Sequence, residues 1–209
     1  MSLALVLTLA DSRLPIGGHV HSGGVEEAIA SGVVRDLPTV EAYLRRRVRT
    51  TGLVAAALAA AVCAGDLEVR EAEFEADARM PAPAARMASR AQGRGLLRLA
   101  RGVWPQVGRE LGPRPHLSTV FGVVGAAAEL APDEIAGVVV YTTMTGSATA
   151  AQRLLALDPA GVAAVTVRLA PLCDEIAARA TTELVALSDP LQDVLAQRHT
   201  TRDMPLFAS

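Results

Sequence analysis

A short segment near the start of the chain contains two glycine pairs and separates a first apolar stretch from everything that follows. It runs from residue 15 to residue 27 and reads Pro-Ile-Gly-Gly-His-Val-His-Ser-Gly-Gly-Val-Glu-Glu. Proline fixes φ, and glycine adopts backbone angles that other residues avoid. The segment therefore predicts a sharp turn between a short apolar helix at residues 2–11 and a second helix at about residues 22–31.

The second half of this segment has the features of a helix start. Ser22 is a residue type that caps helix N-termini, and Glu26 and Glu27 follow in the first turn, where the helix dipole favours acidic side chains. Glycines also let another backbone come close. We therefore consider the segment both as a turn and as a docking surface.

The residue types in this segment allow three chemical interpretations. A phosphate-binding loop needs a lysine after its glycines, and none is present. A metal site is suggested by His19 and His21, which project to the same side of an extended segment, with Glu26 as a further ligand. The third interpretation is a structural turn whose histidines form local hydrogen bonds, and from this segment alone we prefer it.

Composition limits the kind of core and the kind of partner. Hydrophobic residues make up 51% of the 209 residues but aromatic residues only 3%, so the core is built from Ala, Leu and Val, which favours close-packed helices. The net charge of −2 argues against a nucleic-acid binder. All basic residues are arginine, so lysine-based catalysis is excluded. Cys63 and Cys173 lie in apolar segments and are predicted to be packing residues in a reducing compartment.

We expect a cytoplasmic protein that does not cross a membrane. No apolar run reaches about 18 residues without charges or turn signals. The apolar opening stretch lacks the basic residues that begin a secretory signal. The length fits one domain covering residues 1–209.

Helical patterns continue along the rest of the chain. Apolar residues recur at helical spacing from Val40 to Val62, and we expect the neighbouring Arg45, Arg46 and Arg49 to form a solvated face. The acidic stretch at 67–79 is predicted to be an exposed helix whose carboxylates have no partner in a pocket.

The later segments add further helices and their boundaries. The predicted helix after Pro83 is weakened by its glycines, although small residues also suggest close helix contact, and Pro105 should kink or end it. The β-branched stretch at 138–145 is interpreted as helix because it lies between helical patterns. A stripe at 162–184 should bend or break at Pro171, and Asp189 with its neighbours starts a last helix. The fold class is therefore all-α, a single-domain bundle of roughly eight to ten helices.

The glycine-rich segment resembles the N-terminal signature of the urease accessory protein UreF family. Eight positions match that signature: Pro15, Ile16, Gly17, Gly18, Ser22, Gly24, Val25 and Glu26. His21 fits a position where the family has His or an aromatic residue, whereas His19 stands where an aromatic is more usual. Two later segments, at 86–94 and 116–122, also resemble the family, the second with Ser118 in place of Pro.

Two further segments resemble parts of the family that are linked to its partners. Arg153 occupies a basic position linked to control of the partner GTPase, but Ala156, Asp158 and Pro159 replace the Pro, Gly and Gln that follow in the family. The tail at 198–209 resembles the family's C-terminal ending, with Thr200 in place of Glu. In the family this tail becomes ordered against another accessory protein, which implies a docking role here.

The resemblance implies a non-enzymatic adaptor in urease maturation. Proteins of this family are all-helical dimers that bridge UreD (also called UreH) and the nickel-carrying GTPase UreG, and the assembly delivers nickel to apo-urease. We expect no catalytic residue, no cofactor and no metal ligand, and no nucleic-acid or membrane partner. The expected partner-binding residues are Pro15, Gly17, His21, Ser22, Gly24, Glu26, Arg153, Arg198, His199, Leu206 and Phe207.

Two alternatives stay open at this point. One is a small metal-dependent enzyme that uses His19, His21 and Glu26. The other is an all-α interaction protein unrelated to urease.

Overall fold

The structure, a computed structural model, describes residues 2–208. Its α-helices are α1 (Leu3–Leu9), α2 (Val25–Ala30), α3 (Leu37–Arg47), α4 (Leu53–Ala64), α5 (Val69–Arg79), α6 (Pro83–Val103), α7 (Leu117–Ala127), α8 (Pro132–Leu155), α9 (Pro159–Ala180) and α10 (Pro190–His199). A 3-10 turn, η1 (Gly18–Val20), precedes α2, and a π-helical turn, η2 (Val48–Gly52), joins α3 to α4. Residues 2–208 contain no strand, which confirms the all-α prediction.

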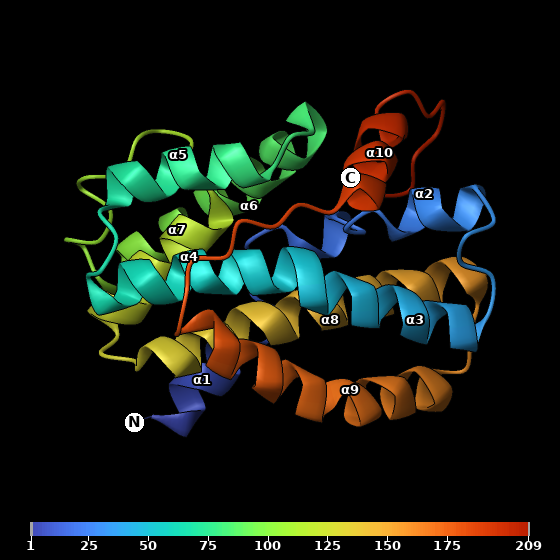
Figure 1. Ribbon diagram of the computed structural model, residues 1–209, viewed down its shortest axis with the longest axis horizontal. Helices are drawn as coiled ribbons and strands as arrows, with labels where there is room; N and C mark the ends of the chain where they lie inside the picture. Colours follow the sequence, from blue (N-terminus) through green and yellow to red (C-terminus); the bar gives the residue numbers. More distant parts are fainter. Residues whose placement is uncertain (1, 209) are drawn as a thin grey trace.

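A long central helix organises this bundle. Because η2 continues the helical path, residues Leu37–Ala64 form one rod of 28 residues. Figure 1 shows the rod crossing the middle of the molecule, with α9 along one side and α5 to α7 along the other. The α4 part of the rod contacts α7, α8 and α9.

The rod is apolar because it is surrounded. By length and hydropathy it is a helix that could cross a membrane, which the sequence pattern did not predict. Eight of the 12 residues of α4 are buried, including Leu53, Ala56, Ala57 and Leu58. Alanine and leucine at these positions allow the three neighbouring helices to approach closely, so its composition is that of a core helix.

An aspartate with a proline one or two positions later begins three of the helices. The side chains of Asp36, Asp158 and Asp189 accept hydrogen bonds from amides in the first turns of α3, α9 and α10. Each cap satisfies an amide that has no partner within the helix, and proline has no such amide to satisfy. The predicted start at Asp189 is thereby confirmed. Pro171 lies inside α9 without breaking it.

Glycines in α6 allow close contacts rather than weakening the helix. A Cβ at Gly93 would overlap the backbone of Pro115 before α7, and a Cβ at Gly95 would lie 2.6 Å from the carbonyl oxygen of Ile16. The helix ends at Val103, just before Pro105. These contacts hold the glycine-rich segment and α7 against α6.

Candidate functional site

The carboxylate of Glu26 binds several residues of the C-terminal tail. Glu26 in α2 is buried, with 3% of its side chain exposed. Its Oε2 accepts from His199 Nε2 at 2.9 Å and from the amide of Phe207 at 3.1 Å. Its Oε1 accepts from the amide of Leu206 at 2.8 Å and lies 3.6 Å from Arg202 Nε. Both oxygens of one side chain therefore hold the last residues of the chain.

These hydrogen bonds set the charge state of the glutamate. Burial by itself raises the pKa of Glu26. The hydrogen bonds from His199 and from the amides of Leu206 and Phe207 together lower it by more than burial raises it, so the pKa lies below its usual value. Because an ionised carboxylate only accepts hydrogen bonds, His199 Nε2 carries a proton in this contact. The pair thus joins a buried anion to a buried donor.

Two neighbouring contacts extend the attachment. Glu27 lies 3.3 Å from Arg202 Nη1 and 3.6 Å from Arg198 Nε. Beyond them, the amide of Ala208 donates to the carbonyl of Val20 at 2.5 Å. The tail consequently lies along the glycine-rich segment, and Figure 1 shows the C-terminal end beside α10 and the N-terminal segment that leads into α2.

The glycine-rich segment is fixed from its other side by α3, α8 and α10. Ser22 is buried, and its carbonyl accepts from the Ser147 hydroxyl in α8 at 3.0 Å. The Tyr43 hydroxyl in α3 donates to the carbonyl of Gly23 at 2.8 Å. A Cβ at Gly24 would lie 2.8 Å from Gln192 Oε1 in α10.

The predicted cap of α2 is shifted by two residues. The residue in the N-cap position is Gly24, with φ of 85°, and not Ser22. A left-handed residue bends the chain directly into the helix, which glycine does without strain. Ser22 still contributes to the helix start, because its hydroxyl accepts from the amide of Glu26 at 3.3 Å.

Phe207 and Leu206 point in opposite directions. Phe207 is buried, and its ring centroid lies 5.4 Å from the guanidinium carbon of Arg153, a cation–π contact. Leu206 is 78% exposed. Phe207 and Arg153 also line a cavity of about 280 Å³. The expected two-residue anchor is therefore divided: within residues 2–208 one side chain is used internally, and the other faces outward.

The structure does not bring every expected residue into this cluster. Pro15 and Gly17 are exposed at the start of the segment, and Gly17 has φ of 84° ahead of η1. His21 lies at the edge of the cluster, where burial first and the charge of His199 second lower its pKa.

The structure also bears on the proposed metal site. His19 is exposed, and Glu26 is already engaged by the tail. Across residues 2–208, no group of three or more His, Cys, Asp or Glu side chains is arranged to hold a metal ion.

Sequence reasoning missed Arg202, although a signal for it exists. The tail carries Arg198, His199 and Arg202 in a chain of net negative charge, and Glu26 and Glu27 are adjacent acids at the other end of the sequence. The opposite charges of these two segments indicate that the tail could pair with Glu26 and Glu27. Tyr43, Ser147 and Gln192 gave no comparable signal, because their roles depend on contacts between distant helices.

A second histidine–carboxylate pair lies inside the bundle. His116, at the N-cap of α7, is fully buried and bonds Asp77 Oδ1 in α5 through Nε2 at 2.9 Å and Ser89 Oγ in α6 through Nδ1 at 3.0 Å. Its amide donates to Glu73 at 2.8 Å, and Arg90 binds Glu73 and Asp77. The prediction that the acidic helix lacks partners was therefore wrong.

Comparison with known proteins identifies the chain's relatives. A model of the UreF family matches residues 34–170. The chain is 67% identical over 211 residues to the urease accessory protein UreF of Mycobacterium sp. (strain JLS), covering 100% of this chain and 99% of that protein. It is 65% identical over 209 residues to the protein of the same name from Mycobacterium tuberculosis (strain ATCC 25618 / H37Rv), with the same coverage.

Proposed function

Since the chain belongs to the family of the urease accessory protein UreF, we propose that it acts as a non-enzymatic adaptor between UreD (UreH) and the GTPase UreG. In this role it holds both partners on apo-urease while nickel is inserted, and it works in the cytoplasm as a homodimer. The alternatives of a metal-dependent enzyme on His19, His21 and Glu26, and of a protein unrelated to urease, do not agree with the family.

One observation supports this proposal most strongly. Glu26 binds the tail residues His199, Leu206 and Phe207, so the two segments that resemble the family most closely, one near each end of the sequence, form one surface. A surface of this kind offers a rigid platform together with an exposed apolar side chain, Leu206. Such a side chain can fill a pocket on a partner at low entropic cost, because the backbone on either side is already held.

We propose that this surface binds UreD through Leu206. Co-expression of the chain with UreD and UreG, followed by size-exclusion chromatography with light scattering, should give an assembly that contains two copies of this chain. Leu206→Glu should remove UreD from the assembly, because a charge would have to be buried in an apolar pocket. Val103→Glu is the matched control, since Val103 is also an exposed apolar residue, at the far end of α6. Loss of UreD in both variants, or in neither, would contradict this assignment.

We further propose that Arg153 controls the coupling to UreG. Its side chain is exposed at the end of α8 and contacts the ring of Phe207, so it can report the position of the tail to a partner. Arg153→Ala should leave the assembly intact and lower GTP-dependent urease activation. An assembly that falls apart would instead make the residue part of the binding surface.

A further inference from the structure

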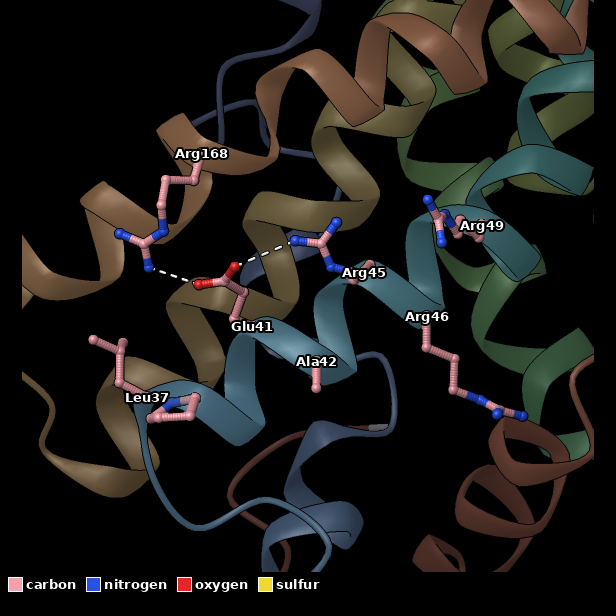
Figure 2. Close-up of a pocket in the computed structure, with 8 residues that line it drawn as sticks. Leu37, Glu41, Ala42, Arg45, Arg46, Arg49 and Arg168 are labelled. Atoms are coloured by element: carbon pink, nitrogen blue, oxygen red, sulfur yellow. Dashed lines mark hydrogen bonds and ion pairs between the residues drawn. The ribbon is translucent and has the colours of Figure 1, made fainter.

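A groove lined by arginine lies along the first part of the central rod. It has a volume of about 610 Å³ and is formed by Leu37, Pro38, Glu41, Ala42, Arg45, Arg46, Arg49 and Arg168. Figure 2 shows Arg45, Arg46 and Arg49 following one another along the rod, with Arg168 facing them from α9. None of these residues belongs to the tail surface described above.

The groove already contains one carboxylate, that of Glu41, bound by two of its arginines. Glu41 lies between two arginines, and its oxygens accept from Arg168 at 2.6 Å and from Arg45 at 3.3 Å. The hydrogen bond from Arg168 is the largest effect on the pKa of Glu41 and lowers it, burial opposes this in part, and the hydrogen bond from Arg45 lowers the pKa further. A carboxylate is thus stable at this position, and arginine is the residue that best matches carboxylate geometry.

Positive charge remains after these pairs are formed. Arg46 is paired with Asp189 at 2.5 Å at the edge of the groove. Arg49 is exposed and has no ion-pair partner within the part of the chain that the structure describes. Two carboxylates therefore face four guanidinium groups, in a chain whose overall charge is −2. Arg45, Arg46 and Arg49 are exposed, as the prediction of a solvated face requires, and Arg168 adds a fourth guanidinium from another helix.

We propose that the arginine groove binds a carboxylate-rich segment of a protein partner. The guanidinium groups are spread along the groove, which suits several separate carboxylates better than one compact anion. Its lining also includes the apolar side chains of Leu37, Pro38 and Ala42, and so matches a peptide in which acidic and small apolar residues alternate. It has no aromatic side chain on which a nucleic-acid base would stack.

The test uses the full chain and a fluorescent peptide of alternating glutamate and alanine. The peptide should bind the wild-type protein, and Arg49→Glu and Arg168→Glu should each weaken binding by roughly tenfold, because each reverses one charge at the groove. Arg98→Glu is the matched control, since it makes the same charge change at an exposed position in α6. It should change binding by less than about twofold.

Three results would overturn the proposal. The first is that the peptide does not bind, or that a peptide with glutamine in place of glutamate binds equally well. The second is that inorganic phosphate or a single-stranded oligonucleotide displaces the glutamate peptide more effectively than unlabelled peptide does, since the groove would then be a phosphate site. The third is that Arg98→Glu weakens binding as much as Arg49→Glu. Arg49 makes no ion pair within residues 2–208, so its variant should retain the wild-type helical signal.

Discussion

Two histidine–carboxylate pairs, each built on a buried imidazole, have nearly the same distance and different surroundings: the Asp77 side chain is 42% exposed, whereas that of Glu26 is 3% exposed. His116 and Asp77 meet at 2.9 Å within the bundle, and His199 and Glu26 meet at 2.9 Å at the tail. The first pair links α5 to the start of α7, and both helices have further contacts with the core. The second pair links a six-residue helix to the end of α10, after which residues 200–208 form no helix or strand.

The difference shows that the role of a polar pair depends on what else holds its two partners. Around His116, Ser89, Glu73 and Arg90 complete a closed network between three helices. At the tail, Glu26 alone supplies the acceptors for two backbone amides and one imidazole. We expect the first pair to stabilise the fold and the second to control whether the tail is attached.

Replacing each histidine by alanine should give the largest difference between the two pairs. His116→Ala should lower the free energy of unfolding by about 3 kcal/mol, because it leaves a cavity and removes partners from Asp77 and Ser89. His199→Ala should lower it by about 1 kcal/mol, because the tail can detach while the bundle stays folded. Urea denaturation followed by circular dichroism measures both. Equal losses would mean that the tail is part of the cooperative core.

Neutralising Glu26 sharpens the comparison. Glu26→Gln keeps the size of the side chain but leaves one acceptor oxygen for three donors, so the amides of Leu206 and Phe207 should exchange with solvent roughly tenfold faster. The free energy of unfolding should fall by about 1 kcal/mol. Hydrogen exchange with mass spectrometry of the C-terminal peptide measures the first effect. Glu71→Gln is the control, because it makes the same change at an exposed position in α5 that has no hydrogen bond or ion pair to the tail within residues 2–208. Unchanged exchange in Glu26→Gln would contradict the attachment.

The smallest expected effect is on the pH dependence of stability, which should differ between the His116 network and the Glu26 site. Burial lowers the pKa of His116, and the hydrogen bond to Asp77 opposes this only in part, with Glu73 and Arg90 also facing the ring. The folded state therefore binds fewer protons than the unfolded state, and stability should fall as pH drops below about 6.5. The pKa of Glu26 is lowered, so its contribution should be present above its usual value of 4.5 and be lost as pH falls below it.

Free energies of unfolding measured as a function of pH check that the His116 effect begins below about pH 6.5 and the Glu26 effect below its usual pKa of 4.5. His116→Gln should remove the part of the dependence near pH 6.5 that comes from this ring, and the part that remains should come from His21, whose pKa burial also lowers. A dependence that is unchanged in His116→Gln would contradict the assignment to His116.

The sequence was sufficient for those parts of the fold that depend on local pattern. Helix starts at Asp189 and Pro132 follow from caps and prolines within a few residues. The left-handed angle at Gly24, which moved the cap of α2 away from Ser22, depends on packing against Tyr43 and Gln192 and was not predictable locally.

The candidate site was predictable in some of its members, such as Glu26 and His199, but not in its connections. Glu26 and His199 were both selected from the sequence, yet 173 positions separate them and nothing local pairs them. Separation in sequence, here 13 to 43 positions, also explains why the partners of Glu73 and Asp77 were missed. Their acceptors face α6 and the start of α7, and a composition of alternating acids does not indicate which side of a helix is covered.

The guanidinium of Arg46 lines the arginine groove and also forms an ion pair with Asp189. Asp189 is also the N-cap of α10, where it accepts from the amide of Gln192 at 3.3 Å, and its side chain is 2% exposed. A ligand that competed for Arg46 would leave this buried carboxylate partly uncompensated and so would weaken the start of α10. By thermodynamic reciprocity, a partner that fixed α10 and its tail would change the affinity of the groove by the same factor. The two surfaces are therefore linked through a single residue, and the molecule has a route by which binding on one side can be sensed on the other.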